Sequence, residues 1–98
     1  MTIAGFDISE REDGGAHLRL TGDWTTSGID RGAQRLNHSL AGRRIVGLDL
    51  SDMGRFDTSG ALAVFLAGGQ NGLPRDAWAG RPEAGRIYAM VEKLERES

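Results

Sequence analysis

Three consecutive polar residues, Asp57, Thr58 and Ser59, have the residue types and the position in the chain that best suit a chemical role. They follow an apolar segment that begins at Ile45, and they precede the uncharged run Gly60–Gly69. This order predicts a buried strand, a short turn and a helix that begins at the hydroxyls. The first N–H groups of a helix lack internal partners and carry the positive end of its dipole. A hydroxyl there can cap the helix, bind an anion or accept a phosphate.

Metal binding is a second chemistry to consider for the acidic residues of this region. Asp49, Asp52 and Asp57 could meet at a strand end and hold a divalent cation through their oxygens. Three acids at a turn are more often solvated or capping, however, and His17 and His38 have no third ligand at a recognisable spacing. We therefore predict neither a metal site nor a cofactor.

Catalysis by paired carboxylates is a third chemistry to consider for this region. Phe56–Ala61 resembles the Asp-Thr-Gly-Ala loop of aspartic peptidases, in which two carboxylates share one proton. Ser59 interrupts that motif, and an all-β peptidase cannot house three segments with helical periodicity. We predict that the protein is not an enzyme. A domain that itself binds a nucleotide or a lipid is a further alternative.

Composition indicates a single compact domain over residues 1–98, either free-standing or excised from a longer chain. The formal net charge is -2 and the only adjacent basic pair is Arg43-Arg44, so nucleic acid is not an expected partner. The absence of cysteine excludes disulfides and thiolate metal sites and is compatible with the cytoplasm. The longest apolar run, Ala61–Ala67, is far shorter than the roughly 20 residues that span a bilayer. We expect a cytoplasmic location, free or at the cytoplasmic face of a membrane complex.

The first half of the chain is predicted to form a hairpin and a helix. Ile3–Ser9 and His17–Thr21 have strand character, and Glu12–Gly15 supplies residues suited to a tight turn. Ser27-Gly-Ile-Asp30 has the spacing of a capping box, which predicts a helix from about Gly28 to Leu40.

The second half is predicted to alternate strands and helices. Ile45–Leu50 reads as a strand, Ser59–Gly68 as a helix and Asp76–Gly80 as a short strand, and Pro82 suits the first position of a last helix. The predicted fold class is therefore α/β: a small mixed sheet of about four strands, with about three helices packed mainly on one face.

The helix that follows Ser59 is apolar on all sides. One face contains the larger side chains and is predicted to point to the core: Leu62, Phe65, Leu66 and Gly69. The opposite face contains small apolar residues: Gly60, Ala61, Ala63, Val64, Ala67 and Gly68. A surface helix normally carries charges on its outer face, so we predict that a protein partner covers this one. The alternative is that small residues permit close packing of the helix between its neighbours.

Leu48–Ser51 and Phe56–Ala61 together resemble the signature of STAS domains, the fold shared by anti-sigma-factor antagonists and the tails of sulfate transporters. That signature is a strand, a short turn and Asp-Ser/Thr-Ser/Gly-Gly at a helix start. Leu18–Thr25, with its Leu-x-Leu-x-Gly-x-Trp pattern, is similar to the STAS-like region of Mla-type lipid-transport ABC permeases and to MlaB-like subunits. The resemblance covers roughly Leu18–Leu94.

The resemblance implies roles at matching positions. Thr58 matches the phosphoacceptor of anti-sigma-factor antagonists, Asp57 the acid beside it, Ser59 the second small residue and Gly60 the glycine that permits close approach. In Mla-like subunits the corresponding region meets the ATPase. The implied function is a non-enzymatic docking module of a lipid-transport ABC system, which binds an ATPase or permease subunit through the start and outer face of the second helix. The implied partner-binding residues are Asp57, Thr58, Gly60, Ala61, Val64, Ala67 and Gly68.

An anti-sigma-factor antagonist is the alternative that the same resemblance implies. In such a protein, a kinase would phosphorylate Thr58 or its neighbour Ser59, and the added charge would control exchange between an anti-sigma factor and the kinase. Threonine where serine is usual, and the Gly22-Asp-Trp24 segment, favour the lipid-transport interpretation.

Overall fold

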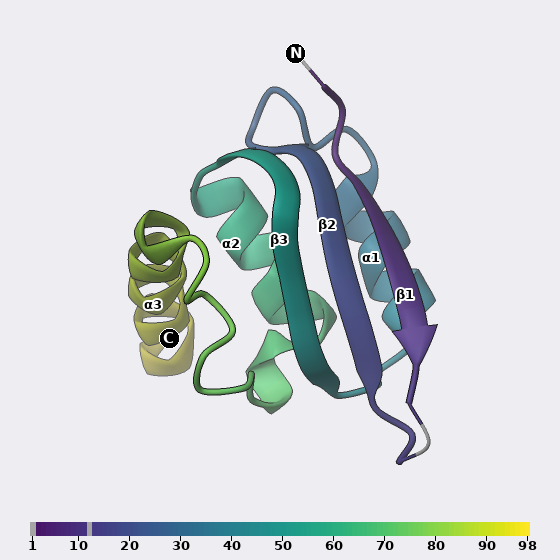
Figure 1. Ribbon diagram of the computed structural model, residues 1–98. Helices are drawn as coiled ribbons and strands as arrows, with labels where there is room; N and C mark the ends of the chain where they lie inside the picture. The colour runs from purple at the N-terminus through teal and green to yellow at the C-terminus, as the bar shows by residue number, and fades with distance from the viewer. Residues whose placement is uncertain (1, 12) are drawn as a thin grey trace.

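In the computed structural model, which describes residues 2–11 and 13–98, three strands and three α-helices form a mixed α/β fold (Figure 1). The elements, in chain order, are β1 (Gly5–Glu10), β2 (Ala16–Trp24), α1 (Gly32–Leu40), β3 (Ile45–Phe56), α2 (Thr58–Ala67), the 3-10 helix η1 (Gly69–Asn71) and α3 (Pro82–Glu97). None of the described helices is both long enough and apolar enough to cross a membrane.

The sheet has the order β1-β2-β3 and contains both kinds of pairing. β1 and β2 are antiparallel, with Gly5 opposite Thr21, which confirms the predicted hairpin. Gly14 has a φ of +83° in the connecting turn, a conformation that glycine adopts without steric cost. Glu12, part of the predicted turn, lies outside the described residues. β2 and β3 are parallel, and α1 forms the crossover that parallel strands require.

The two faces of the sheet differ. α1 and α2 lie against one face, and α3 lies beside α2 near the β3 edge (Figure 1). On the other face Arg19 of β2 forms ion pairs with Asp7 of β1, at 2.7 Å, and with Asp52 of β3. Charged side chains that pair across three strands are typical of a solvated sheet face.

Several predicted element boundaries and one predicted element are wrong. α1 begins at Gly32 rather than Gly28, because Asp30 has a φ of +47° that interrupts the helix, and its N-cap Arg31 makes no capping side-chain bond. The predicted capping box at Ser27–Asp30 therefore does not form. β3 continues past Leu50 to Phe56, paired with the end of β2.

The predicted strand at Asp76–Gly80 does not form. This segment forms turns closed by bonds from Ala77 N to the Pro74 carbonyl and from Ala79 N to the Asp76 carbonyl, both at 3.0 Å. The sheet within the described residues therefore has three strands instead of four. α3 begins at Pro82, as predicted.

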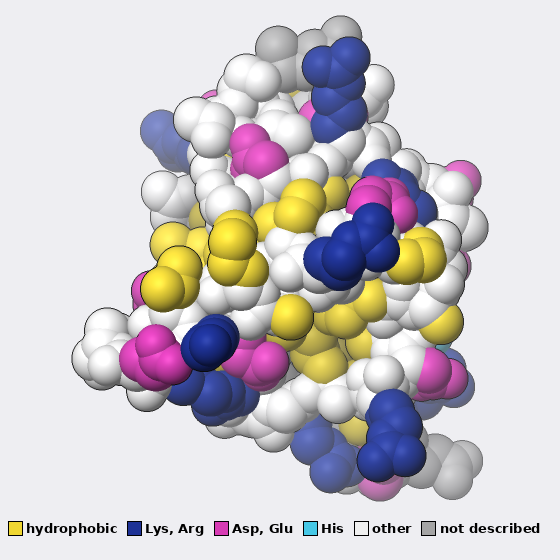
Figure 2. Space-filling model, turned by 90° about the vertical axis from the view of Figure 1, so that its left-hand side faces the viewer, with side chains coloured by type: hydrophobic (Ala, Val, Ile, Leu, Met, Phe, Trp, Pro, Cys, Tyr) yellow, Lys and Arg dark blue, Asp and Glu magenta, His cyan; other side chains and the backbone are white. Residues whose placement is uncertain are grey.

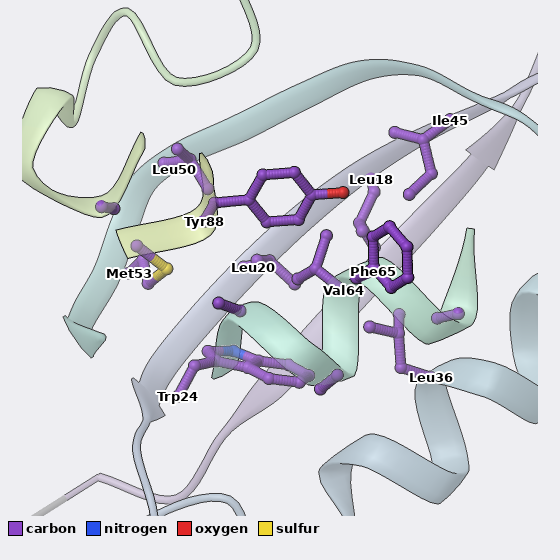
Figure 3. Packing of buried hydrophobic residues seen from close by; sticks show 14 of the residues in the cluster. Leu18, Leu20, Trp24, Leu36, Ile45, Leu50, Met53, Val64, Phe65 and Tyr88 are labelled. Carbon is purple, nitrogen blue, oxygen red and sulfur yellow. The ribbon is translucent and has the colours of Figure 1, made fainter. Parts of the chain in front are cut away.

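The core lies between the sheet and the helices, and residues of β2, β3 and all three α-helices contribute to it. Figure 3 shows Val64 of α2 directed toward Leu20 of β2. Trp24 is fully buried, and its Nε1 donates to the Thr21 carbonyl at 3.0 Å. The core thus fixes the end of β2 and the helix α2, the two elements that surround the candidate site.

Candidate site at the start of helix α2

Asp57 joins β3 to α2 and caps the helix. Its backbone is extended, with φ -137° and ψ -166°, and its Oδ1 accepts a hydrogen bond from the Ser59 N–H at 2.8 Å. α2 begins at Thr58, one residue earlier than predicted. The prediction that a helix starts at these hydroxyls is confirmed. The cap is the carboxylate of Asp57, which satisfies a free N–H of the first turn.

The other carboxylate oxygen of Asp57 binds a loop distant in sequence. Asp57 Oδ2 accepts from the Thr26 N–H at 3.1 Å and lies 3.4 Å from the Thr26 hydroxyl. The same hydroxyl is 2.7 Å from the hydroxyl of Ser59. Asp57, Thr26 and Ser59 therefore form one polar cluster that fastens the start of α2 to the loop after β2.

Thr58 and Ser59 differ in access. The Thr58 side chain is exposed at the first residue of α2, whereas Ser59 is half-buried and engaged by Thr26. Of the two predicted switch hydroxyls, Thr58 is the one that another protein can reach. Modification of Ser59 would first require its contact with Thr26 to break.

Gly60 permits close approach, but to the protein's own chain. It is buried, and a Cβ at this position would overlap the Trp24 carbonyl oxygen and come within 2.8 Å of the Trp24 Cβ. A glycine is therefore required where the first turn of α2 passes over the end of β2. The expectation that Gly60 lies on an outer partner-binding face is wrong.

The prediction of which face of α2 points outward is also wrong. The residues predicted to form the outer apolar face are buried: Gly60, Ala61, Ala63, Val64, Ala67 and Gly68. Phe65 and Gly69 do lie inside as predicted, but Leu62 and Leu66 are 36% and 48% exposed to solvent. The alternative interpretation, close packing through small residues, is the one that the structure confirms.

The neighbours of α2 explain this orientation. α2 packs against α1 on one side and α3 on the other, and Val64 lies over the sheet. The small buried side chains of α2 let these elements approach closely, and the remaining side is left for Leu62 and Leu66. Since α2 is apolar in all directions, its hydrophobic pattern does not define which side is buried.

A polar hollow of about 580 Å³ adjoins the cap. Its lining residues are Thr2, Asp23, Thr25, Ser27, Arg55 and Asp57. The carboxylate of Asp23 accepts hydrogen bonds from the N–H groups of Arg55, at 2.9 Å, and Thr2, at 3.4 Å, and these bonds lower its pKa. Asp23 therefore connects the end of β3 to the segment before β1, and it lines the same hollow as Asp57.

The candidate metal ligands are not brought together. Asp49 accepts hydrogen bonds from the N–H and the hydroxyl of Ser51, and these bonds lower the pKa of Asp49. Asp52 pairs with Arg19, and Asp57 caps α2. The described part of the chain contains no cluster of three or more histidine, aspartate or glutamate residues that could hold a metal ion.

Comparison with known proteins adds nothing further. No protein-family model, curated protein or solved structure matches this chain.

Sequence reasoning missed three residues of this site: Thr26, Asp23 and Arg55. The hydroxyl run Thr25-Thr26-Ser27 was a visible signal, because three such side chains in succession favour a loop that binds polar groups. Nothing local connects that run with Asp57, because 31 residues separate Thr26 from its partner. Only the pairing of β2 with β3 places the two segments side by side.

Proposed function

We propose that this protein is a non-enzymatic docking module, and that its docking surface is the exposed stripe of α2 formed by Thr58, Leu62 and Leu66. These residues are four apart, so they lie on one side of the helix, and all three are exposed. The observation that carries the proposal is that two leucines remain in solvent beside a reachable hydroxyl. Large apolar side chains grouped on a surface favour contact with another protein.

The surroundings of the stripe support this role. Asp57 and Thr26 fix the start of α2, and α1 and α3 hold its sides, so the stripe is presented on a rigid element. Figure 2 shows further hydrophobic side chains among charged ones on the face that contains α3, where Met90 and Leu94 are exposed. A rigid helix loses little conformational entropy when a partner binds.

The proposed partner is the ATPase subunit of a lipid-transport ABC system, at the cytoplasmic face of its membrane complex. Support comes from the resemblance of Leu18–Thr25 and Phe56–Ala61 to the STAS-like region of Mla-type systems. The residues proposed to meet the partner are now Thr58, Leu62 and Leu66, in place of the buried Val64 and Ala67.

Co-purification tests the docking surface. The full chain would be expressed with the lipid-transport ABC ATPase subunit of its native host, as wild type, as Leu62→Glu and as Leu66→Glu. Both variants replace exposed side chains, so we expect them to fold, which circular dichroism checks, and to lose the ATPase. Ile3→Glu, an equally drastic change at an exposed hydrophobic position outside α2 and α3, is the matched control and retains it. Retention of the ATPase by folded Leu66→Glu and Leu62→Glu would refute the proposed surface.

An anti-sigma-factor antagonist is the second candidate, because Thr58 is exposed where a kinase can reach it. A phosphate there would add roughly -1.5 to -2 charge beside Leu62 and would be stabilised by the positive end of α2. Mass spectrometry of the protein from its native host would reveal this modification. Neighbouring genes for a sigma factor and a kinase favour this candidate, and a neighbouring ABC ATPase gene favours the first.

A further inference from the structure

A groove between α1 and β1 is lined by positively charged side chains. Its residues are distant in the sequence from the start of α2. It has a volume of about 710 Å³ and is lined by Phe6, Arg31, Gln34, Arg35, His38 and Ser39. Arg31, the N-cap of α1, and Arg35 and His38 within α1 are spaced four and three residues apart, and all three line the groove. The volume falls within the range of sites for small organic ligands, about 300 to 1,000 Å³.

The two arginines of this groove are free to bind a ligand. In residues 2–11 and 13–98, neither Arg31 nor Arg35 forms an ion pair, and no acidic residue lines the groove. Two unneutralised guanidinium groups therefore face one hollow in a chain whose formal net charge is -2. Guanidinium groups bind phosphate oxygens through pairs of hydrogen bonds, and the amide of Gln34 and the hydroxyl of Ser39 can add further bonds.

Phe6 gives the groove an apolar wall. The centroid of the Phe6 ring lies 6.5 Å from that of the fully buried Trp24, a contact that holds Phe6 against the core. The guanidinium carbon of Arg35 lies 5.9 Å from the centroid of the Phe6 ring. This contact keeps Arg35 at the groove, since a cation over an aromatic face is attracted to it. A ligand with a ring or hydrocarbon next to its charged group would meet both surfaces.

We infer that this groove is a binding site for an organic phosphate monoester, in which Arg31 and Arg35 hold the phosphoryl group and Phe6 contacts the adjoining ring or hydrocarbon. A phosphate monoester carries close to two negative charges at neutral pH, which matches the two arginines. The same chemistry occurs in soluble metabolites and in the headgroup of phosphatidic acid. The site does not depend on the docking surface of α2, and it uses none of its residues.

A titration monitored by 15N–1H NMR tests the site. Phenyl phosphate, inorganic phosphate and uncharged phenol would each be added to the intact chain. Phenyl phosphate should cause saturable shifts at the amides of Phe6 and of α1, inorganic phosphate should bind at least tenfold more weakly, and phenol should produce no saturable shift at these amides. Dihexanoyl phosphatidic acid below its micelle concentration forms a fourth arm. Tighter binding than phenyl phosphate identifies a lipid headgroup as the source, and weaker binding identifies a soluble phosphate.

Paired variants separate the groove from general charge attraction. Arg31→Gln with Arg35→Gln should weaken phenyl phosphate binding at least tenfold, whereas Arg75→Gln with Arg86→Gln, the same change in net charge at exposed positions outside the groove, should leave it unchanged. Phe6→Leu should weaken binding of phenyl phosphate without affecting inorganic phosphate. The inference is overturned if no probe saturates, if phenol produces the same shifts, or if the groove variant binds as the wild type does. Co-purification with the ATPase should be unaffected by the groove variant, so either proposal can fail alone.

Discussion

The hydroxyl of Thr26 lies 2.7 Å from the hydroxyl of Ser59, across 33 residues of sequence. The carboxylate of Asp57 accepts bonds from the N–H groups of both residues, so the loop after β2 and the first turn of α2 are held by the same side chain. The start of α2 is thereby fixed in place while Thr58, between Asp57 and Ser59, remains exposed. This arrangement suits a surface that presents one hydroxyl and two leucines to a partner.

Removal of the Asp57 carboxylate should loosen this junction. Asp57→Ala deletes the helix cap and the bonds to Thr26, and we expect it to lower the free energy of unfolding by about 1 to 2 kcal/mol. Urea denaturation followed by circular dichroism measures the change. Asp76→Ala, at an exposed carboxylate in the 75–80 turns, is the control and should alter stability by less than about 0.5 kcal/mol. Equal stability of the two variants would contradict the capping role.

Gly60→Ala should destabilise the protein, because the clash made by the new methyl group outweighs the higher helix propensity of alanine. Alanine improves a helix interior by about 1 kcal/mol over glycine, but a Cβ here overlaps the backbone carbonyl of Trp24, which cannot swing away. We expect Gly60→Ala to lower the free energy of unfolding by about 1 to 3 kcal/mol. Gly80→Ala, where a Cβ meets nothing within 4 Å, should be nearly neutral. Thermal unfolding of both variants would decide, and a Gly60→Ala protein more stable than wild type would disprove the close approach.

The hydroxyl of Tyr88 should be dispensable for folding. It is buried against Gly69 without a hydrogen-bond partner among the described residues, and Figure 3 shows the ring pointing into the core. Tyr88→Phe removes this unpaired group, so the free energy of unfolding should stay the same or rise by up to about 1 kcal/mol. Denaturation in urea at neutral pH provides the measurement. A clear loss of stability would show that the hydroxyl has a partner.

Alkaline pH should unfold the wild type more readily than this variant. Burial raises the pKa of Tyr88 above its usual value of about 10. The stabilisation of the folded state by the neutral phenol is therefore complete below pH 10. It is lost as the pH rises further, because Tyr88 ionises more readily in the unfolded chain than in the folded one. Stability measured between about pH 9 and pH 11 should fall less steeply in Tyr88→Phe. Parallel profiles would indicate that Tyr88 ionises without unfolding.

Asp23 should contribute to the loss of stability in acid. Hydrogen bonds from the N–H groups of Arg55 and Thr2 lower the pKa of Asp23, so its contribution is present above the unfolded value of about 4 and is lost as the pH falls through the lower, folded value. Asp23→Asn should therefore be less stable than wild type at pH 7 and should lose less stability below about pH 4. Thermal midpoints from pH 7 down to pH 2.5 would test this. If Asp23→Asn and wild type lose the same stability below about pH 4, the loss in acid is due to other carboxylates.

Local features of the sequence were enough to place most elements. The hairpin follows from two strand-like segments around glycine-rich turn residues, and the start of α3 follows from Pro82. α2 was placed to within one residue at each end, because its strand, cap, hydroxyls and apolar run are consecutive in the chain. The strand expected at Asp76–Gly80 failed because local β propensity does not decide whether a segment finds a partner in a sheet.

The tertiary structure alone decided which residues form the surface. In α2 every side is apolar, so the choice between burying Val64 and burying Leu66 depended on how closely α1, α3 and the sheet could approach the helix. In the same way, parallel pairing of β2 with β3 brought Thr26 to Asp57, and packing of α1 beside β1 brought Arg35 to Phe6. The sequence by itself determined where α2 begins and which hydroxyls stand at its start. The side of α2 left in solvent was decided only by packing, because burial depends on contacts between elements that are distant in the chain.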